Sequence, residues 1–175
     1  MRLITVQHRS IIEYLRQNKV YHVDDRLPVA SNLVEPYKFM MKHYQYKHRP
    51  IFCCPVGFCC NFGGCNDREG SYIIEMEVPD KLCRIQDYYG WSDFIYFTEL
   101  PNEFSEFKGL KTVKQFGVYV LDMYRDKNSL DRRLCYQVTI PSIHRSWIKK
   151  IIPVNKNFSD MYVNTGGENI LQSII

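Results

Sequence analysis

Hydrophobic and polar residues alternate most clearly between residues 71 and 79. In an extended chain, one face of this segment carries every second residue, namely Tyr72, Ile74, Met76 and Val78. A period of two residues is typical of a β-strand with one buried face. Similar patterns predict further strands over residues 3–7, 20–23, 134–140 and 147–154, and another that starts at residue 51.

A period near 3.6 residues predicts the helices. The first expected helix covers residues 9–18, with its apolar stripe at Ile11, Ile12 and Leu15. The second has apolar or aromatic residues at Leu33, Tyr37, Met40, Met41 and Tyr44. Pro36 suits the first turn of that helix, where a missing N–H is tolerated. A longer helix is expected over 110–124, and a short helical turn over 91–97.

Strands and helices follow one another without strict alternation, which favours an α+β fold over a parallel α/β fold. The sequence therefore predicts a single α+β domain over residues 1–155, with a twisted, mainly antiparallel sheet and about three helices. Glycine and asparagine residues predict a loop over 61–70. Residues 156–175 are expected to form a C-terminal tail. Its apolar stripe would either dock on its own domain or support self-association, and consists of Ile170, Leu171, Ile174 and Ile175.

Length and composition agree with one globular domain. The chain has 175 residues, of which 45% are hydrophobic and 24% charged. No stretch approaches the roughly 20 apolar residues that span a bilayer, and the first residues become polar too early for a signal peptide. We therefore expect a cytoplasmic protein with no membrane partner. The net charge of +4 permits an acidic partner without requiring one.

Five of the seven cysteines lie in one short stretch. They are Cys53, Cys54, Cys59, Cys60 and Cys65. Such a cluster can hold zinc, with His43 or His48 completing the site, but the spacing differs from two Cys-x-x-Cys knuckles. It can also form disulfides on oxidation. The favoured interpretation is a set of buried thiols, which behave as small hydrophobic side chains in a reducing compartment.

Several short motifs follow one another along the chain in an order that is similar to that of a known family. They are Leu-Ile-Thr-Val-Gln at 3–7, Tyr-Lys-Phe-Met-Met at 37–41, Pro-Ile-Phe at 50–52, the acid-containing strand at 72–78, the aromatic stretch at 87–91, and Tyr-Gln-Val-Thr-Ile at 136–140. Together they resemble an uncharacterised bacterial family, a domain of unknown function found in small intracellular proteins. The likeness covers most of residues 1–155 and implies no activity, because none is assigned to that family.

The same order is similar to the ADP-ribosyltransferase fold, in which a first strand carries His or Arg that grips NAD and a late strand carries a catalytic Glu. Thr5 stands at the first of these positions and Gln137 at the second. The resemblance implies that Thr5 and Gln7 line a cleft, that Tyr37 stacks on a ring and that Gln137 hydrogen-bonds a ribose. A neutral amide gives no negative charge to the transition state. The expected function is thus recognition of NAD or another nucleotide, with weak or absent transferase activity.

A basic and aromatic segment over residues 42–49 supports an alternative function. Lys42, Lys47 and Arg49 lie among tyrosines and histidines, a mixture suited to phosphate contacts and base stacking. The alternative is a non-enzymatic inhibitor from a phage or mobile element, which binds a nucleic-acid or nucleoprotein machine as an anti-defence protein. The basic residues at 144–150 could extend this surface. A solvated helix end explains the same residues without a partner.

Overall fold

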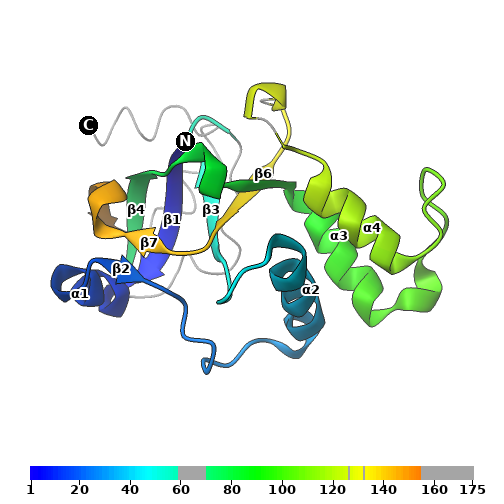
Figure 1. The fold of residues 1–175 in the computed structure, drawn as a ribbon, viewed down its shortest axis with the longest axis horizontal. Coiled ribbons are helices and arrows are strands. Elements are labelled where there is room, and N and C mark those ends of the chain that lie inside the picture. Colours follow the sequence, from blue (N-terminus) through cyan, green and yellow to red (C-terminus); the bar gives the residue numbers. More distant parts are fainter. Residues whose placement is uncertain (59–69, 126, 132, 155–175) are drawn as a thin grey trace.

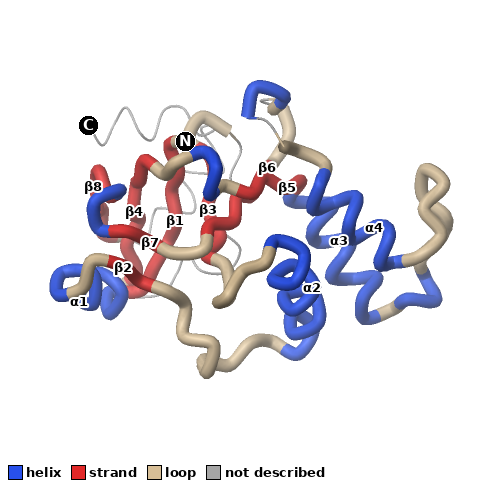
Figure 2. Tube along the Cα trace, viewed as in Figure 1, coloured by secondary structure: helices blue, strands red, loops and turns tan. Residues whose placement is uncertain are grey.

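The structure is a computed structural model that describes residues 1–58, 70–125, 127–131 and 133–154. Its centre is a six-stranded sheet in the order β5-β6-β3-β1-β4-β8, in which every neighbouring pair is antiparallel. A two-stranded ribbon, β2-β7, lies beside α1 (Figure 1). Figure 2 shows the sheet at one end of the molecule and three helices at the other.

The strands are β1 (Arg2–His8), β2 (Val20–Tyr21), β3 (Ile51–Pro55), β4 (Ser71–Glu77), β5 (Arg84–Asp87), β6 (Tyr136–Ile140), β7 (Ile143–His144) and β8 (Ile148–Pro153). The α-helices are α1 (Arg9–Gln17), α2 (Val34–Tyr44), α3 (Tyr88–Glu99) and α4 (Val113–Asp122). Short 3₁₀ turns join several of these elements, including Arg145–Trp147 before β8.

The sheet separates two hydrophobic clusters. On one face, Leu3 of β1, Ile74 of β4 and Val138 of β6 pack with Ile12 and Leu15 of α1. A second cluster joins α2, α3 and α4, and its buried members are Met40, Trp91, Phe94, Phe116, Val120 and Leu121. Phe52 of β3 packs against this second cluster from the opposite face of the sheet. Alternate residues of a strand point to opposite faces, so each strand contributes to both sides.

Local capping explains where the helices begin. Asp87 precedes α3 and accepts a hydrogen bond from the Gly90 N–H at 2.6 Å. Thr112 precedes α4 and accepts one from the Gln115 N–H at 3.2 Å. Side chains of this type at the N-cap satisfy backbone donors that have no partner in the first turn. Helices α3 and α4 pack closely at Gly117, where an added Cβ would lie 2.5 Å from the Phe94 ring.

The α+β class and the mainly antiparallel sheet are confirmed. The described residues form four α-helices rather than about three, because the helical turn expected over 91–97 extends from Tyr88 to Glu99. The helix expected over 110–124 is shorter and covers Val113–Asp122. Strands β5 and β7 were not predicted, since neither is long enough to show a clear period. Residues 61–69 and the tail 156–175 lie outside the described residues.

None of the helices in the described part of the chain combines the length and the apolar character needed to cross a membrane.

Candidate functional site

Two of the expected ligand-binding residues lie together on β1. Thr5 is buried, and its hydroxyl donates to the Phe52 carbonyl at 2.8 Å. The Gln7 amide donates to the Thr5 hydroxyl at 2.8 Å, so both side chains point to the same face. Leu3, two residues earlier, belongs to the cluster that includes α1. Thr5 and Gln7 therefore face the α1 side of the sheet.

Gln137 is on β6, only 7% exposed and held in a buried polar network. Its amide donates to Gln86 Oε1 at 3.0 Å. The Gln86 amide in turn donates to the Thr139 hydroxyl at 3.0 Å and to the Tyr44 hydroxyl at 3.2 Å. Tyr44 donates to the Leu121 carbonyl at 2.6 Å. The network thus ties β5 and β6 to α2 and α4, which is a structural role for the amide of Gln137.

The cleft implied by the resemblance, with Thr5 and Gln137 around one ligand, is wrong, because β3 separates β1 from β6 and the two side chains point to opposite faces of the sheet. Phe52 pairs with Thr139, so Gln137 points to the same face as Phe52. Thr5 instead shares its face with Cys53, because Ile4 pairs with Cys54. The alternation of side chains along three paired strands therefore places Thr5 and Gln137 on opposite sides of the sheet.

Tyr37 lies on the Gln137 side. Its ring stacks on Phe52 with centroids 5.6 Å apart and planes at 29°. Near it, burial raises the pKa of Tyr44, and burial raises the pKa of Tyr46 to about 12, so both hydroxyls stay protonated as donors. Tyr46 donates to the Thr139 carbonyl at 3.2 Å. Tyr37 and Tyr44 of α2, together with Tyr46 just after it, thus contact residues of the sheet.

The predicted basic surface is divided by the fold. Lys42 and Lys47 are exposed. Arg49, in contrast, has a side chain only 12% exposed, and it donates to the backbone carbonyls of Asp24 and Leu27. Its guanidinium also lies 3.6 Å from the Asp25 carboxylate. Arg49 therefore stabilises the connection after β2 and is not available as a partner contact, which corrects that part of the prediction.

Only part of the cysteine cluster can be placed. Cys53 and Cys54 are buried, and as neighbours on β3 they face opposite sides of the sheet. Cys59, Cys60 and Cys65 lie outside the described residues. Of the two histidines considered for zinc, His43 contacts Asp122 at 3.0 Å and His48 contacts Asp25 at 2.9 Å. Within the described ranges, no three potential ligands are grouped for a metal ion.

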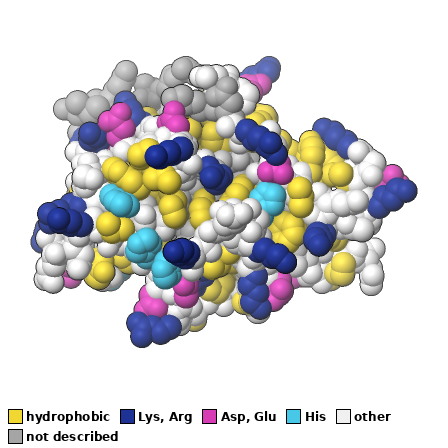
Figure 3. Space-filling model, in the orientation of Figure 1, with side chains coloured by type: hydrophobic (Ala, Val, Ile, Leu, Met, Phe, Trp, Pro, Cys, Tyr) yellow, Lys and Arg dark blue, Asp and Glu magenta, His cyan; other side chains and the backbone are white. Residues whose placement is uncertain are grey.

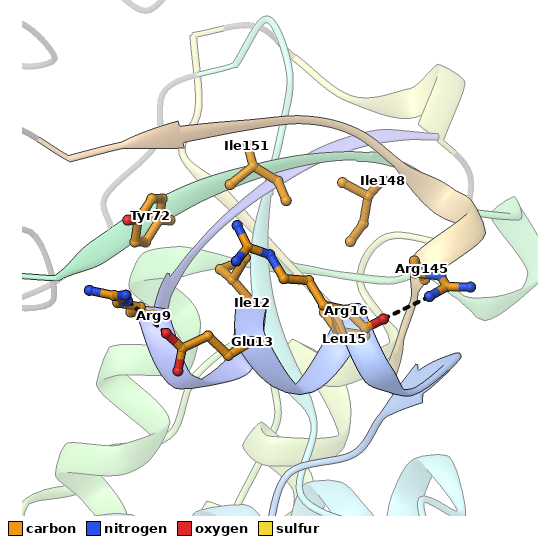
Figure 4. A pocket seen from close by; sticks show the side chains of 9 residues that line it. All are labelled: Arg9, Ile12, Glu13, Leu15, Arg16, Tyr72, Arg145, Ile148 and Ile151. Atoms are coloured by element: carbon orange, nitrogen blue, oxygen red, sulfur yellow. Dashed lines mark hydrogen bonds and ion pairs between the residues drawn. The ribbon is translucent and has the colours of Figure 1, made fainter.

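A groove between α1 and the β4-β8 edge of the sheet gathers basic side chains over an apolar floor. Its cavity has a volume of about 620 Å³. The floor and walls consist of Ile12, Leu15, Tyr72, Ile148 and Ile151, and the charged residues are Arg9, Glu13, Arg16 and Arg145. Figure 4 shows Arg9 at one end, Arg145 at the other and Arg16 reaching across the opening toward Ile151.

The three arginines are held differently. Arg9 donates to the Glu13 carboxylate at 2.7 Å, one turn further along α1. Arg145 donates to the backbone carbonyl of Arg16 at 3.0 Å. The guanidinium of Arg16 makes no hydrogen bond or ion pair with any other described residue. Arg16 is thus the cation of this groove that is available to a ligand.

The charged side chains of the groove are mainly basic. Among the described residues that line it, the one carboxylate is that of Glu13, which Arg9 engages. An arginine-rich groove of this kind is suited to an anionic ligand.

The spacing of charged residues in the sequence indicates the part of this groove that α1 forms. Arg9, Glu13 and Arg16 recur at i, i+4 and i+7, which places them on one stripe of a helix, next to Ile12. A charged stripe beside an apolar one is normally a solvated helix face, so the pattern alone does not indicate a site. Arg145 joins them only through the fold, although it belongs to the basic segment noted at 144–150.

Comparison of the chain with models of protein families, with curated proteins and with solved structures gave no match.

Proposed function

We propose that this protein is a cytoplasmic nucleotide-binding protein without transferase activity, and that its ligand occupies the groove between α1 and β8. The observation that carries the proposal is the arrangement of Arg9, Arg16 and Arg145 around one apolar cavity. NAD is one candidate ligand. The location in a cytoplasm is part of the proposal.

Both halves of a nucleotide have a counterpart in the groove. Guanidinium groups bind phosphate oxygens through paired, charge-assisted hydrogen bonds. The apolar floor, with the ring of Tyr72 and the 41% exposed Ile151, offers a surface for a base. A volume of about 620 Å³ is within the range of roughly 300–1,000 Å³ that is usual for small-molecule sites.

Gln7 lies on β1, the strand expected to bind the ligand, next to a residue that lines this groove. It pairs with Tyr72 across β1 and β4, so both residues belong to the same face. Gln137 is remote from this face, which supports a binding protein over a transferase.

Calorimetry with NAD, ADP-ribose and ATP tests the proposal, with adenosine as the ligand that lacks phosphate. Arg16→Gln removes the cation that has no partner within the described structure, and we expect affinity to fall about tenfold or more, as for loss of a charge-assisted hydrogen bond. Arg133→Gln is the matched control, because Arg133 is paired locally with Asp131 and lies outside the groove. Equal affinity for adenosine and the nucleotides, or an equal loss in both variants, contradicts the proposal.

A specific observation also favours the nucleoprotein-binding alternative. Lys42 of α2 and Lys114 of α4 line one cavity of about 380 Å³, together with the rings of Phe39 and Phe94. Glu35, however, lines the same cavity, and Figure 3 shows Lys and Arg side chains interspersed with acidic ones over the face that it draws. A surface of this kind predicts weak, salt-dependent contact with phosphates.

Fluorescence anisotropy with a labelled mixed-sequence oligonucleotide tests this second function. The double variant Lys42→Glu with Lys114→Glu should abolish binding, while Lys47→Glu should retain it, since Lys47 is exposed but does not line the cavity. Unchanged binding by the double variant rules out this surface.

A further inference from the structure

A separate cavity of about 630 Å³ lies between α3 and α4, at the end of the molecule remote from α1. Gly90, Asp93 and Phe97 face it from α3 at i, i+3 and i+7. From α4 it is lined by Phe116, Tyr119 and Val120. The two helices run antiparallel, so the cavity extends from the start of α3, near Tyr124, toward the turn that contains Phe107.

Half of the described residues that line this cavity are aromatic. The rings belong to Tyr89, Phe97, Phe104, Phe107, Phe116, Tyr119 and Tyr124. Several contact one another edge to face, for example Phe107 with Phe116 at 5.6 Å and Phe107 with Tyr119 at 5.9 Å between centroids. Figure 3 shows hydrophobic side chains exposed over this end of the molecule. Aromatic faces carry partial negative charge and attract cations.

Two carboxylates, Asp87 and Asp93, also line the cavity. Asp87 caps α3 by accepting the Gly90 N–H. Asp93 makes no hydrogen bond or ion pair with any other residue in the described ranges. Burial raises the pKa of Asp93, and the nearby Asp87 charge raises it further. Asp93 is exposed, so its carboxylate is accessible to a ligand, and the nearby Asp87 adds to the negative charge at this end of the cavity.

The chain itself shows that this aromatic wall holds an ammonium group. Lys108 Nζ lies 5.4 Å from the Phe107 ring centre and 5.6 Å from that of Tyr119, and it donates to the Tyr119 hydroxyl at 3.3 Å. Lys108 and Gly109 have φ of 48° and 79° in the turn between Phe107 and Leu110. This left-handed turn sets the course of the backbone at Lys108, and the exposed Lys108 ammonium forms no ion pair with Asp87 or Asp93 in the described structure.

We infer that the cavity between α3 and α4 binds an aliphatic ammonium ligand, with the ammonium at Asp93 and the attached alkyl chain along the aromatic walls. The ligand chemistry is that of a free polyamine or of a lysine side chain. A volume of about 630 Å³ accommodates either one. This site would bind a cation, whereas the groove at α1 would bind an anion. A negative result for one ligand therefore does not bear on the proposal for the other.

Calorimetry on the full chain tests the inference with two probes at neutral pH. Spermidine represents a free polyamine, and an acetylated, amidated lysine represents a side chain; butanol is the uncharged reference. We expect saturable binding of an amine but not of butanol. Binding of spermidine alone identifies a free polyamine, and binding of the lysine compound identifies a protein side chain. Absence of binding by both amines at millimolar concentration overturns the inference.

Asp93→Asn removes the carboxylate charge and should weaken amine binding by about tenfold or more, as expected for a charged hydrogen bond. Glu99→Gln removes one charge from the same helix at a residue that does not line the cavity, and should leave binding nearly unchanged. An equal loss in both variants would indicate only a general effect of charge and would overturn the site. The melting temperature of each variant shows that it is folded.

Discussion

Arg145 donates a hydrogen bond of 3.0 Å to the carbonyl oxygen of Arg16, a residue 129 positions earlier in the chain. This bond joins the 3₁₀ turn before β8 to the last turn of α1. It satisfies a helix carbonyl that has no partner within the helix, and it places a cation at the negative end of the helix dipole. It also closes one end of the groove proposed for nucleotide binding.

Replacing Arg145 by alanine should therefore lower the free energy of unfolding by roughly 0.5–1 kcal/mol, the usual range for one hydrogen bond that is partly open to solvent. Urea denaturation measures the change. Arg133→Ala is the control, because the Arg133 guanidinium pairs locally with Asp131, two residues away, and with no other residue that the structure describes. No difference between the two variants would show that the link to α1 contributes nothing to stability.

Gln137→Glu tests directly whether the buried amide stands in for a catalytic glutamate. A carboxylate in the network with Gln86 would be desolvated. We expect the free energy of unfolding to fall by about 2 kcal/mol at pH 7 and no transfer of ADP-ribose to appear. Because burial favours the protonated acid, the loss of stability should shrink as the pH falls.

The matched substitution is Gln115→Glu, at an exposed position in the first turn of α4. A negative charge near a helix N-terminus is favourable, so this variant should not be destabilised. Transferase activity gained by Gln137→Glu would restore the catalytic interpretation of this residue.

Arg49 and Lys47 are close in sequence but should respond very differently to alanine. Removing the Arg49 side chain leaves the carbonyls of Asp24 and Leu27 without their donor. We expect a loss of about 2 kcal/mol in the free energy of unfolding for Arg49→Ala. Lys47 is exposed, and Lys47→Ala should have little effect. Thermal and urea denaturation of both variants provide the measurement, and similar effects would contradict a structural role for Arg49.

Asp93→Asn should raise the melting temperature at pH 7, because the pKa of Asp93 is raised in the folded protein above its ordinary value of 3.8. The folded state binds a proton more readily than the unfolded state, so the wild-type protein gains stability as the pH falls through the raised pKa. The advantage of the variant should disappear over the same pH range. An advantage that persists at low pH would show a cause other than the charge.

His144 provides a pH test on the β2-β7 ribbon. Its ring stacks on Trp147 at 4.0 Å, and its pKa is lowered by burial and then by the nearby His22. The ordinary pKa of a histidine is 6.5, and in the folded protein the pKa of His144 is lower. As the pH falls below 6.5, the unfolded chain binds the proton more readily than the folded one, so the protein loses stability. An NMR titration of His22→Gln should show the pKa of His144 moved upward but still below 6.5. An unchanged pKa would exclude His22 as a cause.

The strand over Ser71–Glu77 and the helix α1 could be predicted because their patterns are local and regular. The strand β5 could not, since Arg84, Gln86 and Asp87 are polar residues that become part of a sheet through pairing with β6. Gln86 is fully buried in spite of its polarity. Its partners on β6 and α2 satisfy its amide, and those partners are more than 40 residues away.

The sequence by itself determined the α+β class, most of the strands and the stripes of α1, because side-chain periodicity depends on backbone geometry within a few residues. Only the tertiary structure decided which residues meet. The insertion of β3 separates β1 from β6, and the register of these three strands places Thr5 and Gln137 on opposite faces of the sheet. The docking of β8 brings Arg145 to α1. Such contacts follow from the order of strand pairing, which depends on the burial of the whole chain and leaves no local pattern.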